Sequence, residues 1–372
     1  MHLLAAVLLA ASVAQATPRP PAPSKAPPAT DPANQTPPPR GAIPGLVAEG
    51  NRPVQIASGF RFTEGPAADA SGQIYFVDVI TSRILKVTSM ELDASKAREN
   101  TTDFVVNDGH CYGLMFGRDG RLFAAQGDSP GTGTLGGVCE IDLASKKITP
   151  LLSAPEIDGA PTPVTRANDL AVDAEGGIYF TDPSLGRIPS KSKGILYRSP
   201  TGASSRVDTT IAAPNGVRLS ADGKHLFALS FDDPGVYRFE VLAPGRLGPA
   251  EKFASLVGKS GLSPGGRGDG LAIDEKGNLW CANPDTSEIQ VVSPEGVVLG
   301  RVPVLESPSN CAFGGADGRT LFITARTSLY GLRTEVAGTW IARSAKAAAT
   351  PTTKPTTNPT TSPASAPKPA GR

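Results

Sequence analysis

The sequence predicts an all-β fold, a six-bladed β-propeller, and two observations carry that prediction. The first is a template that occurs six times: a polar residue, a short apolar strand, a turn closed by glycine, and a second apolar strand. The second is the length of each repeat, which leaves room for about four short strands, the content of one propeller blade. The repeats open at Glu64, Tyr112, Asn168, Asn215, Asp269 and Asn310, and their turn glycines are Gly72, Gly120, Gly176, Gly223, Gly277 and Gly318.

Each repeat is expected to begin with a β-hairpin. In the fifth repeat, the apolar residues 271–273 run into a polar turn, which Gly277 closes because glycine adopts positive φ without strain. Residues 278–280 follow with large side chains that suit packing between sheets. Further strands such as 194–198 complete the blades. We therefore expect the propeller to occupy residues 46–336.

The segments outside the repeats are expected to be disordered, proline-rich tails. Residues 1–16 combine a short apolar run with the triplet Ala-Gln-Ala, the pattern of a cleaved signal peptide, and the run is too short to span a membrane. The composition of residues 17–45 is typical of a proline-rich linker, and that of 337–372 of a Thr/Pro/Ala-rich low-complexity tail. These features predict an exported protein, periplasmic or extracellular. The tail is interpreted as a solvated spacer, with association to the cell surface as the alternative.

Charge and cysteine content narrow the function classes. The chain has 36 basic and 35 acidic residues and a net charge of +1, so it lacks the basic footprint of a nucleic-acid-binding protein. The four cysteines form no C-x-x-C pair, which argues against a zinc or redox motif. Sequence leaves open whether they form a disulfide or remain buried thiols; they are Cys111, Cys139, Cys281 and Cys311.

The first residues of the six repeats form a candidate metal site. The inner strands of a propeller run in the same direction, so two carboxylates, three carboxamides and one phenol should ring one mouth of the central channel. Such hard oxygen donors suit Ca²⁺, and Zn²⁺, Mg²⁺ and Mn²⁺ remain open as alternatives. A different interpretation is that Asn and Asp occur there because they cap turns well. That interpretation does not explain Glu64, because Glu is a poor turn former.

The ordered motifs of all six repeats resemble the gluconolactonase family, which includes the senescence marker protein regucalcin. The motifs are F-T-E-G-P at 62–66, R-A-N-D-L at 166–170, I-Y-F-T-D-P at 178–183, A-P-N-G at 213–216, G-D-G-L at 268–271 and P-S-N-C-A-F-G-G at 308–315. The resemblance implies one divalent metal in the channel. It assigns Glu64, Asn215 and Asp269 as metal ligands, Asn168 as a contact to metal or substrate, and Arg166 as a substrate-binding residue.

These groups predict the hydrolysis of a sugar lactone. The metal would act as a Lewis acid, and Asp269 is the candidate general base that accepts a proton from the attacking water, with pure metal ligation as its alternative role. Tyr112 departs from the amide and carboxylate pattern and is expected to shape the substrate pocket. His110, two residues earlier, is an alternative base.

Two other function classes stay open. One is a metal-dependent esterase or organophosphate hydrolase that uses the same ring of residues. The other is a non-catalytic propeller that binds sugars or a protein partner, because a fold does not by itself establish an activity.

Overall fold

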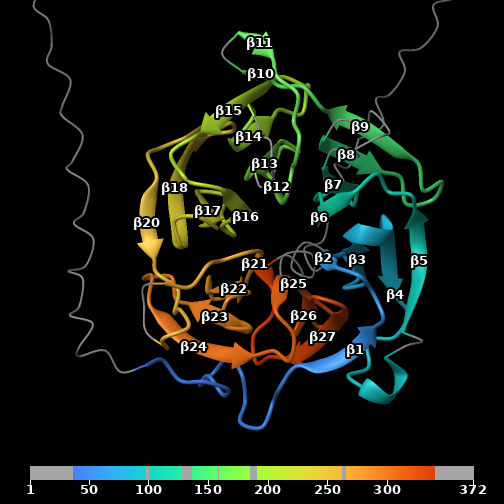
Figure 1. Ribbon diagram of the computed structural model, residues 1–372, viewed down its shortest axis with the longest axis vertical. Helices are drawn as coiled ribbons and strands as arrows, with labels where there is room; N and C mark the ends of the chain where they lie inside the picture. The colour runs from blue at the N-terminus through green and yellow to red at the C-terminus, as the bar shows by residue number, and fades with distance from the viewer. Residues whose placement is uncertain are drawn as a thin grey trace, which may run out of the picture. The chain divides into compact units, whose positions relative to one another are not determined.

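Six antiparallel sheets surround a central axis in the computed structural model, which describes residues 37–97, 100–127, 136–157, 159–184, 191–261 and 265–339 (Figure 1). Each sheet holds four or five strands, and the two 3-10 helices have three residues each. The predicted six-bladed β-propeller is therefore confirmed.

Five blades follow one another along the chain, each with its innermost strand first. The first blade contains β2 (Thr63–Ala68), β3 (Ile74–Asp78), β4 (Arg83–Val87) and β5 (Thr101–Val106), with the 3-10 helices η2 (Val79–Thr81) and η3 (Ala94–Lys96); the second contains β6 (Cys111–Phe116), β7 (Leu122–Gln126), β8 (Gly137–Ile141) and β9 (Ile148–Leu152). The third contains β12 (Leu170–Val172), β13 (Ile178–Asp182), β14 (Gly194–Arg198) and β15 (Ser204–Asp208), and a separate hairpin of β10 (Glu156–Ile157) and β11 (Ala160–Pro161) precedes it. The fourth contains β16 (Pro214–Leu219), β17 (His225–Ser230), β18 (Gly235–Ala243), β19 (Arg246–Leu247) and β20 (Glu251–Ala254); the fifth contains β21 (Leu271–Ile273), β22 (Leu279–Asn283), β23 (Glu288–Val292) and β24 (Val298–Pro303).

The sixth blade joins the two ends of the propeller. Its inner strands are β25 (Pro308–Gly314), β26 (Thr320–Ala325) and β27 (Ser328–Arg333), and its outer strand is β1 (Val54–Ser58). Strand β1 pairs antiparallel with β27, from Val54 opposite Gly331 to Ser58 opposite Ser328. The ring is thus closed by backbone hydrogen bonds between residues far apart in the sequence.

The turn glycines behave as the repeats predict. In all six inner hairpins the glycine has a positive φ, between 67° and 88°, and its N–H donates to the carbonyl three residues earlier. Side chains other than glycine are strained in this region of φ, which explains why the same residue recurs at the same step of each repeat.

Large apolar side chains of the second strands fill the spaces between blades. Phe180 of β13 packs with Phe123 of the preceding blade, and Tyr179, on the opposite face of the same strand, packs with Leu226 of the following blade. Trp280 is completely buried between the fifth and sixth blades. Alternate residues of one strand therefore stabilise two different interfaces, as the period of a β-strand requires.

The ends of the propeller differ from the predicted boundaries. The Arg40 guanidinium lies 2.8 Å from a Glu288 carboxylate oxygen, and the Arg301 N–H donates to the Pro39 carbonyl. Ile43 belongs to the core between the last two blades. Residues 38–45 are consequently part of the propeller and not of the linker predicted at 17–45. At the other end, Gly338 pairs with Asp274, so packing continues past the predicted boundary at residue 336.

Several predictions made for the flanks lie outside the described residues. They concern the signal peptide at 1–16, the linker up to residue 36 and the tail from residue 340 onward. Within the described residues, no helix has both the length and the apolar character needed to cross a membrane. The four cysteines, which the sequence left open, are buried free thiols.

The corrected boundary predicts the effect of shortening the chain. A chain that begins at residue 47 should be less stable than one that begins at residue 37 by more than about 3 kcal/mol, because it loses the burial of Ile43 and Leu46, which are 2% and 4% exposed. Removing residues 1–36 alone should leave Tm unchanged. Urea unfolding of the full chain and the two shortened chains measures both differences. Equal stability of the two shortened chains would contradict the packing of residues 38–46.

Candidate active site

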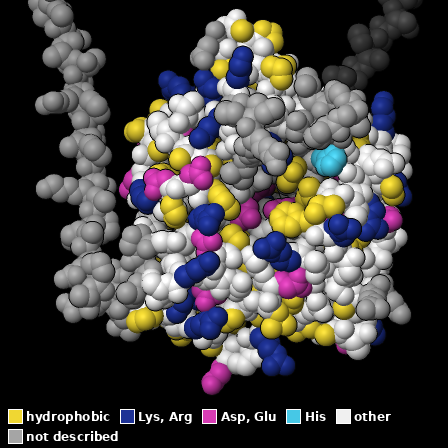
Figure 2. All heavy atoms as spheres, in the orientation of Figure 1, with side chains coloured by type: hydrophobic (Ala, Val, Ile, Leu, Met, Phe, Trp, Pro, Cys, Tyr) yellow, Lys and Arg dark blue, Asp and Glu magenta, His cyan; other side chains and the backbone are white. Residues whose placement is uncertain are grey.

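The structure brings the six repeat-opening residues to one mouth of the channel. Glu64, Tyr112, Asn215 and Asn310 lie near the start of their inner strands, and Asn168 and Asp269 stand just before theirs. The Asn310 amide nitrogen lies 3.5 Å from a Glu64 carboxylate oxygen, and Asn215 donates a hydrogen bond to Asp269. Figure 2 shows a hollow at the centre of one face, with acidic and apolar side chains gathered in it.

Main-chain contacts between neighbouring blades hold the mouth together. The N–H groups of Gly113, Gly216 and Gly270 donate to carbonyls of the following blade at 2.7–2.8 Å. A Cβ on Gly216 would lie 2.3 Å from the Asp269 carbonyl oxygen, closer than real side chains approach. Glycine therefore follows the ring residue because the next strand occupies the space of a side chain.

At two other blade boundaries, side-chain hydroxyl groups form the hydrogen bond to the neighbouring blade. Thr181 Oγ1 donates to the Asn215 carbonyl at 2.7 Å, and Ser309 Oγ donates to the Thr63 carbonyl at the same distance. Both hydroxyl-bearing residues are buried. The backbone that carries Glu64 and Asn215 is thus fixed from the adjacent blade.

Burial, together with the crowding of acidic groups, raises the pKa values of Glu64 and Asp269. Burial raises the pKa of Glu64 well above its usual range, and repulsion from Asp269 and Asp169 adds to this effect. Burial also raises the pKa of Asp269 to about 7, again with repulsion from Asp169, while the hydrogen bond from Asn215 acts in the opposite direction. A bound cation would relieve this repulsion.

Asp169 is a member of the site that the sequence did not single out. It is completely buried, and one carboxylate oxygen accepts hydrogen bonds from the Leu170 N–H at 2.8 Å and from Arg218 Nη1 at 2.9 Å. Its other oxygen has no hydrogen-bond partner among the described residues. The motif R-A-N-D-L contains Asp169, and its place beside Asn168 is the signal that could have identified it.

The site fits a hard divalent cation. Asn215 Oδ1 and Asp169 Oδ2 are both buried and lack a hydrogen-bond partner in the described part of the chain, which is costly unless a ligand satisfies them. Among the described residues, no group of three or more His, Cys, Asp or Glu side chains is arranged to hold a metal by itself. The candidate ligands are therefore a mixture of two carboxylates and two amides, Glu64, Asp269, Asn168 and Asn215, the oxygen chemistry that Ca²⁺ prefers.

The predicted substrate residues lie on one side of the same mouth. Tyr112 packs against Gly127, where a Cβ would stand 2.8 Å from the phenol ring. Gly127 in turn pairs with the backbone of Arg166 and donates to the His110 carbonyl at 2.9 Å. Tyr112, Arg166 and His110 are all partly exposed, so they are accessible to a small molecule at the mouth.

The fold and the site together define a six-bladed propeller with an oxygen-rich, acidic centre at one channel mouth. Residues 62–327 match the family described as the SMP-30/Gluconolactonase/LRE-like region. The chain belongs to this family.

Known proteins similar to the chain include named lactonases. A gluconolactonase of Zymomonas mobilis is 26% identical over 306 residues, which cover 76% of this chain and 81% of that protein. A pentonolactonase, XacC, of Haloferax volcanii is 26% identical over 269 residues, which cover 71% of this chain and 81% of that protein. The crystal structure of a calcium-binding protein, regucalcin, of Agrobacterium tumefaciens superimposes with a TM-score of 0.58 at 20% identity, over 81% of this chain and 97% of that one.

The raised pKa of Asp269 predicts a pH-dependent stability in the metal-free protein. Because its folded pKa of about 7 exceeds that of an ordinary Asp, the folded state binds the proton more tightly, and stability falls as pH rises toward and through 7. In the presence of chelator, the wild type should lose free energy of unfolding between pH 5 and pH 8 relative to Asp269→Asn, by an amount on the order of 2 kcal/mol. Urea unfolding at both pH values measures this loss. If the difference in free energy of unfolding between the two proteins is the same at both pH values, the pKa of Asp269 is not raised.

Because the inner strands lie so close together, we expect a single added methyl group at Gly216 to destabilise the protein. Gly216→Ala should lower the free energy of unfolding by more than about 2 kcal/mol and weaken metal binding, because its Cβ collides with the Asp269 backbone. The control is Gly223→Ala in the turn of the same blade, where φ is positive but no atom lies within 4 Å of the added Cβ. That variant should lose about 1 kcal/mol from backbone strain and keep its metal affinity. Equal metal affinity in the two variants would contradict the role of the contact.

Proposed function

We propose that the protein hydrolyses a sugar lactone at the channel mouth, with one divalent cation, Ca²⁺ by preference, bound by Glu64, Asn168, Asn215 and Asp269. The observation that carries the proposal is the cluster of mutually repelling carboxylates beside two buried oxygens that have no hydrogen-bond partner in the described part of the chain. The substrate class rests on family membership and on the relatives named gluconolactonase and pentonolactonase. The preference for Ca²⁺ is supported by the oxygen donors and by the neighbour named as a calcium-binding protein.

The cation, when bound, supplies a Lewis acid that stabilises negative charge on the lactone carbonyl oxygen. The chain's own residues supply proton transfer and orientation. Asp269 is only partly exposed, and Asn215 donates to its carboxylate and so fixes its direction. In the ionised form, this carboxylate can accept the proton of a water molecule at hydrogen-bonding distance.

The remaining residues have positioning roles in this proposal. The N–H of Gly65 donates to a Glu64 carboxylate oxygen at 3.0 Å, and Asn310 lies close to the same oxygen, so the Glu64 side chain is held in place. Arg166 carries a guanidinium that can pair with substrate hydroxyls or with the carboxylate of the product. Tyr112 forms part of the wall on which the sugar ring would rest.

A panel of aldonolactones and aryl esters, assayed with and without chelator, tests the proposal. Chelation should abolish lactone hydrolysis and also lower stability, by roughly 3 kcal/mol relative to protein in a hundredfold excess of metal over Kd. Added Ca²⁺ should restore both. Lactone turnover and melting curves that chelator leaves unchanged would remove the metal from the mechanism, and turnover of esters without lactones would change the substrate class.

A pair of isosteric variants separates metal ligand from general base. Asp269→Asn and Glu64→Gln each remove one negative charge, so both should bind metal more weakly. At saturating metal, only Asp269→Asn should remain impaired, by about 10²–10⁴ in kcat, because it alone loses the proton acceptor. Steady-state kinetics across a metal titration provides the comparison. Equal rescue of both variants would make Asp269 a ligand alone, with His110 the next candidate base.

We also propose that the protein is exported. The support is the apolar run and small-residue triplet within residues 1–16. Expression of the full chain in a bacterium, followed by fractionation and N-terminal sequencing, should recover a chain that begins at residue 17 outside the cytoplasm. Recovery of uncleaved chain in the cytoplasm alone would refute export.

A further inference from the structure

A cavity of about 360 Å³ lies at the end of the channel opposite the candidate active site. The ring residues stand at the start of the inner strands, whereas the cavity is lined by the residues that end them, including Ala68, Phe116, Leu219 and Ile273. Cavities of roughly 300–1,000 Å³ are of the size that encloses small ligands. The two sites are therefore separate openings of one channel.

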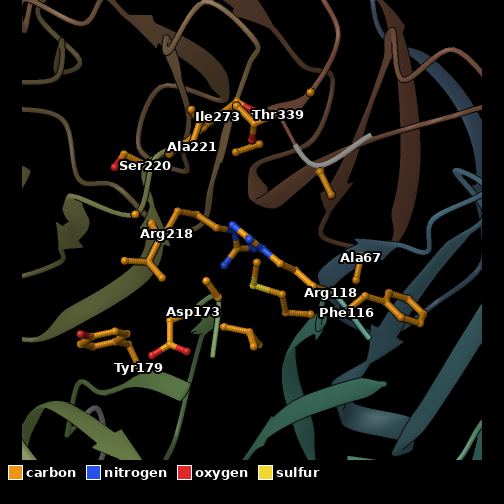
Figure 3. Close-up of a pocket in the computed structure, with 18 of the residues that line it drawn as sticks. Ala67, Phe116, Arg118, Asp173, Tyr179, Arg218, Ser220, Ala221, Ile273 and Thr339 are labelled. Carbon is orange, nitrogen blue, oxygen red and sulfur yellow. Dashed lines mark hydrogen bonds between the residues drawn. The ribbon is translucent and has the colours of Figure 1, made fainter. Parts of the chain in front are cut away.

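Two arginine side chains meet inside this cavity. Arg118 comes from the turn between β6 and β7, and Arg218 comes from β16 on the facing wall. Figure 3 shows their guanidinium groups pointing toward one another across the cavity. Because like charges repel, an anion that lies between the two groups would be attracted by both of them.

Among the described residues, only Arg218 of these two arginines has an acidic partner, which is Asp169. Arg218 Nη1 donates to Asp169 at 2.9 Å and to the carbonyls of Leu170 and Val217, and its side chain is only 12% exposed. Neither the remaining nitrogens of Arg218 nor the guanidinium of Arg118 has a hydrogen bond or ion pair to another described residue. Several N–H donors thus face the cavity without an acceptor.

The lining also contains three acidic residues, Asp173, Glu175 and Asp222, which make hydrogen bonds at turns or are exposed. Asp173 accepts hydrogen bonds from the N–H groups of Glu175 and Gly177 at one oxygen and from the Tyr197 hydroxyl at the other, so both oxygens already have donors. Asp222 holds the equivalent turn of the next blade. Glu175 and Asp222 are exposed and lie at turns on the outer surface. The charged groups that face one another across the cavity are therefore the two guanidinium groups (Figure 3).

The other residues that line the cavity indicate which class of anion it would bind. Most of it is apolar, with Leu114, Met115, Val172 and Phe313 among its members. A sugar acid with many hydroxyl groups would leave those hydroxyls without partners on such a wall. We propose that the cavity binds a small carboxylate with an apolar body, which places its two oxygens between Arg118 and Arg218. This site is independent of the proposed lactonase function.

The inference can be tested by calorimetric titration of the full chain in chelator, at constant ionic strength, with three probes of equal size. Benzoate supplies the carboxylate, benzyl alcohol the neutral body, and benzylammonium the opposite charge. Benzoate should bind with one site per chain, and the other two probes should bind at least about tenfold more weakly, because charge-assisted hydrogen bonds distinguish them. Benzyl alcohol that binds as well as benzoate, or benzylammonium that binds better, would overturn the proposal, as would the absence of benzoate binding.

Three variants locate the binding. Arg118→Gln should weaken benzoate binding by about tenfold or more without a change in Tm, because Arg118 is exposed and makes no contact with a described side chain that the fold requires. The matched control is Arg121→Gln, which removes a charge from the same turn but outside the cavity and should keep its affinity. Glu64→Gln at the other mouth should also keep it. Undiminished binding by Arg118→Gln, or a loss in Glu64→Gln equal to that in Arg118→Gln, would overturn the assignment.

Discussion

The close contact between neighbouring inner strands is the constraint on which the rest of the site depends. Glycine N–H groups donate to carbonyls of the next blade at 2.7–2.8 Å, and two buried hydroxyls make the same connection where glycine is replaced. The narrow neck that results forces Glu64, Asp269 and Asp169 near one another. Burial at this neck and repulsion between neighbouring acids raise the pKa values of Glu64 and Asp269, and a bound cation would relieve that repulsion.

Much of this arrangement could be predicted from the sequence because it repeats. The turn glycines and the ring residues follow from one template read six times, and each hairpin is formed by residues close together in the chain. The pairing of β1 with β27 could not be predicted in the same way, because it joins residues almost the full length of the propeller apart and carries no repeat signal. The packing of Ile43 was missed for a different reason: the proline-rich composition around Ile43 gives no sign that this residue enters the core.

Asp169 and Arg218 show a second limit of sequence patterns. They lie in different blades and form an ion pair that no local spacing records. The position of Asp169 next to Asn168 marked it as part of a motif, but not as a buried acid with one oxygen that lacks a hydrogen-bond partner among the described residues. Tyr112 lies near the start of β6, and its ring packs against Gly127, a contact that the repeat pattern does not record.

The same ion pair connects the two ends of the channel. One oxygen of Asp169 accepts from Arg218, which faces the cavity, and its carboxylate contributes to the repulsion on Glu64 and Asp269 at the mouth. Asp169 therefore has two roles, as the partner of Arg218 and as a source of repulsion on the acids of the mouth.

Proton release on Ca²⁺ binding tests the central claim most directly, because it reports the protons that the crowded carboxylates hold without metal. Calorimetric titration at pH 6.5, in buffers that differ in ionisation enthalpy, gives the number released per ion. We expect one ion per chain and a net release that declines as pH rises above 7 and is smaller in Asp269→Asn. Binding without proton release at pH 6.5, or no binding at all, would contradict the claim that the blade contacts create a cation site from repelling carboxylates.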